Sequence, residues 1–263
     1  MAEVSRLVAL ADELRVGSLA QPPYCADSAR PLAEVLDEAT RQSFDLLPVL
    51  NAGRPITHVI TRTALAGLSH WGQLADVAAP LTADLLVSAD APALSVLDRL
   101  DRHSVLFTLG SAGVEGVITI YDLNEPSAHL LGFGLVLVCE EAIAAWIRRQ
   151  LGADADKAAA EIRRLNAAGS GFGRWKRLRA ADQHGDLATA LTLGEKIRVI
   201  DGLGPGELAQ RVGIEAADLL PKLERVRELR NAIGHYDEES LADPTWVHMR
   251  MVETRDLARH LAT

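Results

Sequence analysis

The chain has 263 residues, of which 48% are hydrophobic and 24% charged, and it carries a formal net charge of −9. This balance is typical of globular proteins, and the length suits one large domain or two small ones. The negative net charge argues against non-specific binding of duplex nucleic acid over the whole surface. The two cysteines, Cys25 and Cys139, have a spacing that suits no metal site, so we expect free, buried thiols in a reducing cytoplasm.

The first half of the chain contains an internal repeat. Val35-Leu36-Asp37 returns as Val96-Leu97-Asp98, and Val59-Ile60-Thr61 returns as Val117-Ile118-Thr119. Each copy is predicted to contain an extended lead, a helix with an acidic start, an apolar strand, a Gly-rich turn, a second strand and a further helix. The expected elements are a lead from residue 16, a helix at 31–42, a strand at 45–50 and a turn at 51–53 in the first copy, and a lead from residue 77, a helix at 91–103, a strand at 105–109 and a turn at 111–113 in the second.

Two segments of this repeat resemble parts of tandem cystathionine-β-synthase (CBS) domains. Leu47-Pro48-Val49-Leu50 is similar to the first strand of such a domain. Gly116-Val117-Ile118-Thr119-Ile120-Tyr121-Asp122 resembles the family's nucleotide-binding signature, in which Thr or Ser precedes Asp by three residues. The resemblance implies that residues 1–126 form an α+β tandem CBS pair that binds an adenine nucleotide.

Thr119 and Asp122 are the residues that the resemblance assigns to this nucleotide. A hydroxyl at a strand end can contact phosphate or ribose, and a carboxylate at the next helix start can accept from ribose hydroxyls or cap the helix. The first copy departs from the signature, because His58 stands where the second copy has Gly116 and Ala64 stands where it has Asp122. We therefore expect at most one adenosine-type site per pair.

From Glu125 onward the alternating pattern disappears. Pro126 suits the first turn of a helix that runs to about Leu151. The longest apolar run, from Leu130 to Cys139, is too short to span a bilayer, so we expect a buried helix and no membrane partner. Further helices are expected at 154–167, 193–200, 206–212, 219–233 and 243–261, and a flexible loop at 169–173. Residues 127–263 are therefore predicted to form an all-α helical bundle.

Positive charge gathers between residues 162 and 180, where six cations occur and no acid. One interpretation is a solvated helix face with a loop. The other is an RNA-binding surface, because arginines beside an aromatic ring suit phosphate contact combined with base stacking. The residues assigned to this surface are Arg174, Trp175, Lys176 and Arg177.

The pattern of Arg, four residues and His occurs twice, as Arg230/His235 and as Arg255/His260. About 0.7 matches are expected by chance in a chain of this composition, so the spacing alone carries little weight. The second match lies at the C-terminal end, where fraying is common. The first follows a helix with one apolar stripe, and Gly234 is expected to end that helix.

The first match resembles the signature of the HEPN (higher eukaryotes and prokaryotes nucleotide-binding) superfamily. The resemblance extends to Leu229, Asn231 and Tyr236-Asp237, and to the upstream segments Leu191-Thr192-Leu193-Gly194 and Ile197-Arg198. It implies a HEPN-like helical domain at 127–263 that acts as a homodimeric, metal-independent endoribonuclease on an RNA substrate. It further implies that no cofactor is required, and it suggests a role in stress or antiviral defence.

The residue types suit this chemistry. RNA cleavage without metal uses the ribose 2′-OH as nucleophile, a general base to accept its proton and an acid to protonate the leaving oxygen. Histidine titrates near neutral pH and can do either, while a guanidinium can stabilise the phosphoryl oxygens. By resemblance, His235 is the acid or base, Arg230 the phosphate clamp and Asn231 the group that orients the phosphate or His235.

Helix geometry limits what one chain can do. Five residues on an ideal helix turn through about 500°, a net 140°, so Arg230 and His235 would lie on different faces. Their convergence requires either a helix that loosens at Gly234 or a second copy of the chain.

Non-catalytic interpretations stay open at this point. Arg230 could form a surface salt bridge with Glu228 or Asp237, and His235 could simply suit a helix C-terminus. The chain would then be an adenine-nucleotide sensor whose helical domain serves in dimerisation or partner binding.

Overall fold

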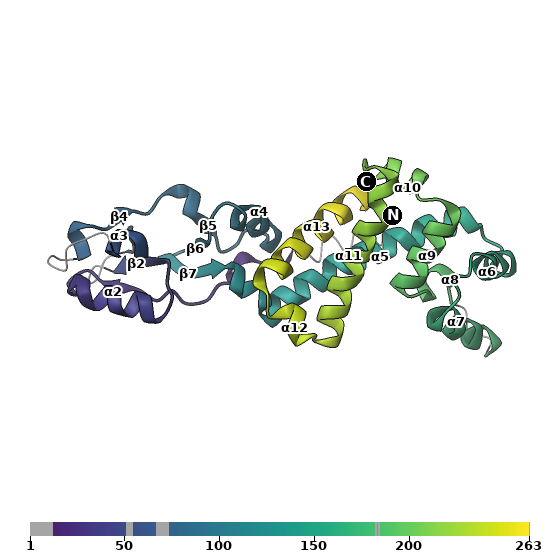
Figure 1. The fold of residues 1–263 in the computed structure, drawn as a ribbon, viewed down its shortest axis with the longest axis horizontal. Coiled ribbons are helices and arrows are strands. Elements are labelled where there is room, and N and C mark those ends of the chain that lie inside the picture. Colours follow the sequence, from purple (N-terminus) through teal and green to yellow (C-terminus); the bar gives the residue numbers. More distant parts are fainter. Residues whose placement is uncertain (1–12, 51–54, 67–73, 182, 184, 263) are drawn as a thin grey trace. The chain divides into compact units, whose positions relative to one another are not determined.

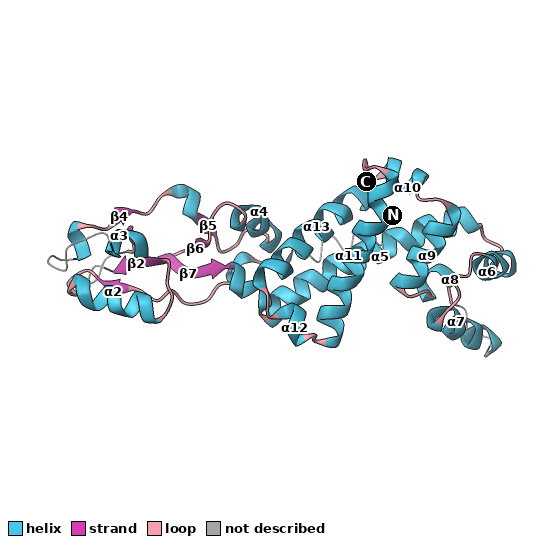
Figure 2. Ribbon diagram, viewed as in Figure 1, coloured by secondary structure: helices cyan, strands magenta, loops and turns pink. Residues whose placement is uncertain are grey.

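The structure of the protein, a computed structural model, describes residues 13–50, 55–66, 74–181, 183 and 185–262. The chain divides into two compact units, one of Leu14–Glu125 and one that contains the chain from Pro126 onward (Figure 1). The first unit holds all the described strands, and the second is helical (Figure 2). The division falls one residue before the expected boundary between 126 and 127. The expected turn at 51–53 lies outside the described residues.

One small sheet belongs to the first copy of the repeat. Its strand β2 (Leu46–Leu50) pairs in parallel with β1 (Ala26–Asp27) and antiparallel with β3 (His58–Thr61). Strand β4 (Ala79–Pro80) extends the sheet beyond β3. The apolar residues of β2 and β3 form a core with helix α2 (Leu32–Arg41), as their spacing predicts.

The second sheet repeats this plan. Strand β6 (Val105–Gly110) pairs in parallel with β5 (Leu86–Ser88) and antiparallel with β7 (Gly113–Thr119). The predicted repeat is therefore confirmed in its strand order, and the unit is α+β with two small sheets. The remaining helical segments are short, namely η1 (Val16–Ser18), α3 (Arg62–Ala66), η2 (Leu74–Asp76), η3 (Ala83–Leu85), η4 (Ala93–Val96), α4 (Leu97–Leu100) and η5 (Ile120–Asn124).

The second unit consists of helices, as predicted. They are α5 (Pro126–Leu151), α6 (Ala155–Arg164), α7 (Ser170–Ala180), α8 (Leu187–Ala190), α9 (Leu193–Leu203), α10 (Gly206–Arg211), α11 (Ala216–His235), α12 (Glu238–Leu241) and α13 (Pro244–Ala262). Helices α5, α11 and α13 pack against one another (Figure 1). Gly132 permits this approach, because a Cβ there would lie 2.9 Å from Cδ1 of Ile233 on α11.

Helix α5 has the predicted bounds, Pro126 to Leu151, and its 26 residues extend beyond the ten-residue apolar run. By length and composition alone it could cross a bilayer, and 56% of its most apolar stretch is buried within the protein. Its buried side chains include Leu131, Ile143 and Trp146, which are 2% exposed or less. This degree of burial is typical of a core helix.

The expected flexible loop at 169–173 is wrong, because α7 begins at Ser170. The buried carboxylate of Glu195 accepts hydrogen bonds from the backbone N–H groups of Gly171 and Phe172, and from the N–H and hydroxyl of Thr192. A Cβ at Gly171 would collide with Glu195 and with the backbone that follows α8. The glycines therefore serve close packing. Burial raises the pKa of Glu195, but these hydrogen bonds outweigh burial and lower it.

The predicted helix end at Gly234 is also wrong. Helix α11 continues through Gly234 to His235 and is terminated by Tyr236, which has a left-handed conformation with φ of 50°. The N–H of Asp237 donates to the carbonyl of Ala232 at 2.9 Å, which satisfies one of the last helical carbonyls. His235 therefore stands in the last turn of a regular helix.

Candidate functional site

A cavity of about 590 Å³ lies in the first unit and is lined by both copies of the repeat. The first copy contributes the segment that follows α2 and strand β2, and the second contributes β6, β7 and the start of η5. Thr119 borders this cavity, together with Ile120 and Tyr121. The strand order thus places the end of the predicted nucleotide signature beside the first copy.

Thr119 and Asp122 are brought together in this unit. The backbone N–H and the hydroxyl of Thr119 both donate to Oδ2 of Asp122, at 2.7 and 2.9 Å. The hydroxyl also accepts from the N–H of Tyr121 at 3.2 Å, which makes a capping box at the start of η5. Burial raises the pKa of Asp122, against the hydrogen bonds from Thr119. Asp122 therefore fixes the Thr119 hydroxyl at the edge of the cavity.

The first copy forms a simpler cap at the equivalent place. The hydroxyl of Thr61 accepts from the N–H of Ala64 at 3.0 Å, and no carboxylate is present at position 64. Nearby, Arg62 pairs with Asp45 at 2.7 Å. The two copies therefore differ at the position where the signature requires Asp.

Aromatic side chains at the cavity were missed in the sequence. Tyr24, Phe44 and Tyr121 all line it, although the chain has only three Tyr and four Phe in all. Tyr24 and Phe44 are stacked, with ring centroids 5.2 Å apart. Tyr121 is 71% exposed. Their spacing in the sequence gives no sign of this grouping, because they come from three separate segments.

At the end of α11, Arg230 donates through Nη1 to Oδ1 of Asn231 at 3.2 Å. Arg230 is half-buried, while Asn231 and His235 are exposed. The helix is regular over this segment, so Arg230 and His235 point in directions about 140° apart. Asn231 and His235, four residues apart, share a face. Loosening at Gly234 is therefore excluded as a means of bringing Arg230 and His235 together.

The acids expected to pair with Arg230 have other partners. Glu228 lies 3.2 Å from Nη2 of Arg250, and Asp237 accepts from the hydroxyl of Ser240 at 2.7 Å. Tyr236, directly after His235, makes an edge contact with the ring of His129 on α5, with centroids 6.4 Å apart. The helix end is thus anchored through Tyr236.

A hollow of about 490 Å³ lies beside this helix end. Asn231 and Asp237 line it together with Trp246 and Arg250 of α13. The guanidinium of Arg250 lies 5.5 Å from the ring centroid of Trp246, a cation–π distance. The two residues stand four apart on one helix, a spacing that could have indicated a shared face.

The four residues of the predicted RNA-binding surface divide into two groups. Arg174, Lys176 and Arg177 are exposed, but Trp175 is 4% exposed. The indole N–H of Trp175 donates to the carbonyl of Gly185 at 3.0 Å, and the guanidinium of Arg179 lies 5.3 Å from its ring centroid. Trp175 packs inside the helical unit, so its ring is not presented for base stacking.

Within the part of the chain that the structure describes, no group of three or more His, Cys, Asp or Glu side chains could hold a metal ion. Burial raises the pKa of the Cys139 thiol, with Glu140 beside it acting in the same direction. Cys139 is fully buried, as expected, whereas Cys25 is only partly buried.

No family model matches the chain, and no curated protein matches it. The chain is similar to the CBS domains of a transcriptional regulator from Streptococcus pneumoniae, with 19% identity over 43% of this chain and 98% of that chain, at a TM-score of 0.38. It is similar to the CBS domain of a bacterial CNNM/CorC family Mg2+ transporter in complex with ATP. The identity is 17% over 46% of this chain and 92% of that chain, at a TM-score of 0.37. A CBS-pair protein from Arabidopsis thaliana matches with 15% identity over 41% and 90%, also at 0.37. Because these TM-scores lie below 0.5, the expectation of nucleotide binding rests on the cavity and its residues.

Proposed function

We propose that the chain is a metal-independent endoribonuclease that works as a homodimer and is regulated by an adenine nucleotide bound to its first unit. The observation that carries the ribonuclease proposal is the surface end of α11. Arg230, Asn231 and His235 lie on this last part of the helix, and among the described residues Arg230 is hydrogen-bonded to Asn231, while the acids Glu228 and Asp237 have other partners. A guanidinium without a carboxylate partner keeps its charge available to a phosphate.

The proposed reaction is attack by the ribose 2′-OH on the adjacent phosphorus, with departure of the 5′-oxygen. His235 accepts the 2′ proton or supplies the proton to the leaving oxygen, and Arg230 stabilises the phosphoryl oxygens. Asn231 holds Arg230 through the 3.2 Å hydrogen bond and offers its amide N–H groups to the phosphate. The products are a 2′,3′-cyclic phosphate and a free 5′-hydroxyl.

The dimer follows from the geometry of α11. A single helix end provides one histidine, turned away from its own Arg230 by about 140°. A twofold axis beside this end would bring together two copies of each group, so that one His235 acts as base and the other as acid. One chain therefore carries half of the proposed site.

The first test incubates the purified full chain with an end-labelled RNA in EDTA. We expect cleavage that leaves a 2′,3′-cyclic phosphate, while a DNA of the same sequence survives because it lacks the nucleophile. An RNA with a single 2′-deoxy substitution at the cleaved position is the matched control and should resist cleavage there. A dimeric protein that leaves RNA intact would contradict the proposal, as would cleavage of the DNA.

The nucleotide proposal rests on the cavity between the two copies of the repeat. Three aromatic rings can contact a base, and Thr119, held by Asp122, can contact the ribose. Among the described residues that line the cavity, none is Lys or Arg. We therefore infer that the adenosine moiety provides most of the affinity, which favours AMP or S-adenosylmethionine over ATP.

Calorimetric titration with AMP, ATP and S-adenosylmethionine tests this assignment. Replacing Thr119 by Val should weaken binding about tenfold, because it removes a hydroxyl from the cavity edge and keeps the side-chain shape. Thr61→Val, at the equivalent position of the first copy, is the matched control and should bind as the unmodified protein does. Heat from none of the three ligands would remove the sensor proposal.

The second candidate function is a non-catalytic sensor, and the same cavity favours it. In that case the chain binds the nucleotide and the helical unit serves in dimerisation or partner binding. Nucleotide binding without RNA cleavage would select this candidate. Where both activities are found, equal cleavage rates with and without saturating nucleotide would contradict regulation.

A further inference from the structure

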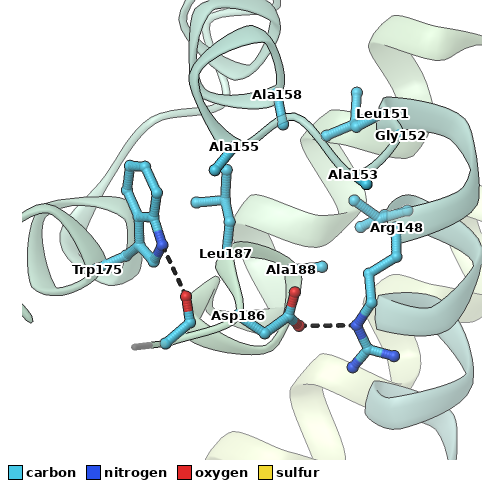
Figure 3. A pocket seen from close by; sticks show the side chains of 12 residues that line it. Arg148, Leu151, Gly152, Ala153, Ala155, Ala158, Trp175, Asp186, Leu187 and Ala188 are labelled. Atoms are coloured by element: carbon cyan, nitrogen blue, oxygen red, sulfur yellow. Dashed lines mark hydrogen bonds and ion pairs between the residues drawn. The ribbon is translucent and has the colours of Figure 1, made fainter. Parts of the chain in front are cut away.

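A second cavity, of about 410 Å³, lies within the helical unit among α5, α6, α7 and α8 (Figure 3). Helix α11 contributes none of its lining residues, so the cavity is separate from the proposed cleavage site. It combines one charged end with walls of apolar side chains.

The charged end is formed by Arg148 of α5 and Asp186, the residue before α8. Nε of Arg148 donates to Oδ2 of Asp186 at 2.8 Å, and Nη2 donates to Oε1 of Glu141 at 2.8 Å. Thr189 donates to the same Oδ2 through its N–H and its hydroxyl, at 2.8 and 2.6 Å. One guanidinium is thus shared by two carboxylates, of which only Asp186 lines the cavity.

The two oxygens of Asp186 differ in their surroundings. Oδ2 has three donors, whereas Oδ1 has no donor among the described residues. Figure 3 shows one carboxylate oxygen bonded to Arg148 and the other turned away from the arginine, toward the residues that line the cavity. Burial raises the pKa of Asp186, but hydrogen bonds from Thr189 and Arg148 outweigh burial and lower it, so the carboxylate is charged at neutral pH.

The walls suit a compact apolar group. Ile147, Leu151 and Leu187 line the cavity, with alanines that leave room between them. The indole of Trp175 also lines it, and the hydrogen bond to Gly185 holds this ring in one orientation. A rigid wall of this kind adds affinity because little side-chain freedom is lost on binding.

We propose that this cavity binds a small organic cation, a protonated primary amine with an apolar or aromatic body. The ammonium group donates to Oδ1 of Asp186, and the body lies against Leu187 and the ring of Trp175. Charge-assisted hydrogen bonds of this type are about twice as strong as neutral ones, and the apolar walls reject a strongly hydrated ion without a hydrophobic body. The assignment does not depend on the proposed ribonuclease activity.

The test compares three probes of one shape by calorimetry on the full chain: 2-phenylethylammonium, 2-phenylethanol and 3-phenylpropionate. We expect the ammonium to bind at least tenfold more tightly than the alcohol, and the carboxylate to bind most weakly. Equal affinities for the ammonium and the alcohol, tighter binding of the carboxylate, or no binding of the ammonium would each overturn the proposal.

Two pairs of variants locate the binding. Asp186→Asn keeps a capping side chain for α8 but removes the charge, and it should abolish the preference for the ammonium. Asp154→Asn, the same substitution at the N-cap of α6, is the control because Asp154 does not line the cavity. Ala155→Leu should fill the cavity and prevent all binding, whereas Ala160→Leu, at a position of the same helix that does not line the cavity, should not. An ammonium preference that survives in Asp186→Asn, or binding that survives in Ala155→Leu, contradicts the assignment.

Discussion

Two segments of the helical unit share the spacing of Arg, four residues and His, and they differ in the burial of the arginine. On α11, Arg230 is half-buried and His235 is exposed. On α13, Arg255 is 3% exposed, and its Nε and Nη2 donate to Oδ1 of Asp256 at 3.0 and 2.8 Å. The sequence suggested a frayed C-terminal end, but helix α13 continues to Ala262. Both histidines are exposed, so burial of the arginine, and not the spacing, distinguishes the two segments.

The strongest test of this difference is removal of each histidine. Replacing His235 by Ala should lower RNA cleavage by about 10³-fold, because the proposed acid or base is lost. His260→Ala removes the histidine of the other segment and should leave the rate within about twofold. Single-turnover rates on the same RNA, with dimers verified by sedimentation, provide the measurement. Equal loss in both variants, or in neither, would remove the distinction between the segments.

For stability we expect the opposite order: removal of the arginine should matter more in the segment on α13 than in the segment on α11. Arg255→Ala should lower the free energy of unfolding by roughly 2 kcal/mol, because a buried side chain and its packing are lost. Arg230→Ala should cost less, about 0.5 kcal/mol, since this side chain is only half-buried and has no ion pair among the described residues. Urea denaturation followed by circular dichroism measures both. A larger loss for Arg230→Ala would mean that α11 depends on this side chain for its structure.

The elements that local pattern determines could be predicted from the sequence. Helix α5 was placed from Pro126 to Leu151 because proline favours a first turn and the apolar run follows it. The repeat was visible because buried strands are short apolar runs bounded by turn residues. These features depend on neighbours along the chain, and for that reason they can be predicted from the sequence alone.

Features that depend on distant residues were missed. The glycines at 169–173 suggested flexibility. However, Glu195, more than twenty residues later, packs against them and accepts hydrogen bonds from backbone N–H groups in the first turn of α7. Tyr24, Phe44 and Tyr121 meet at one cavity only after the two copies of the repeat pack together. The same holds for burial of Arg255, which periodicity in α13 does not specify.

The residue after each arginine offers a smaller test. Asn231 accepts one hydrogen bond from Arg230, where the other segment has a carboxylate, Asp256. Asn231→Asp should therefore form an ion pair, neutralise the proposed phosphate clamp and lower cleavage about tenfold. Asn231→Ala removes the amide without adding charge and should cost less. If the alanine variant is the slower of the two, the amide itself matters more than the charge of Arg230.

The smallest expected effect concerns the pair on α13. The side chain of Asp256 is 50% exposed, so water screens its ion pair with Arg255. Asp256→Asn should therefore lower the free energy of unfolding by only about 0.5 kcal/mol. The measurement is urea denaturation at low and high salt, where a surface-screened pair should lose its small contribution as salt rises. A cost as large as that of Arg255→Ala would mean that charge pairing, rather than packing, holds the buried arginine. The charge of the residue that follows the arginine would then distinguish the two segments more than the burial of the arginine does.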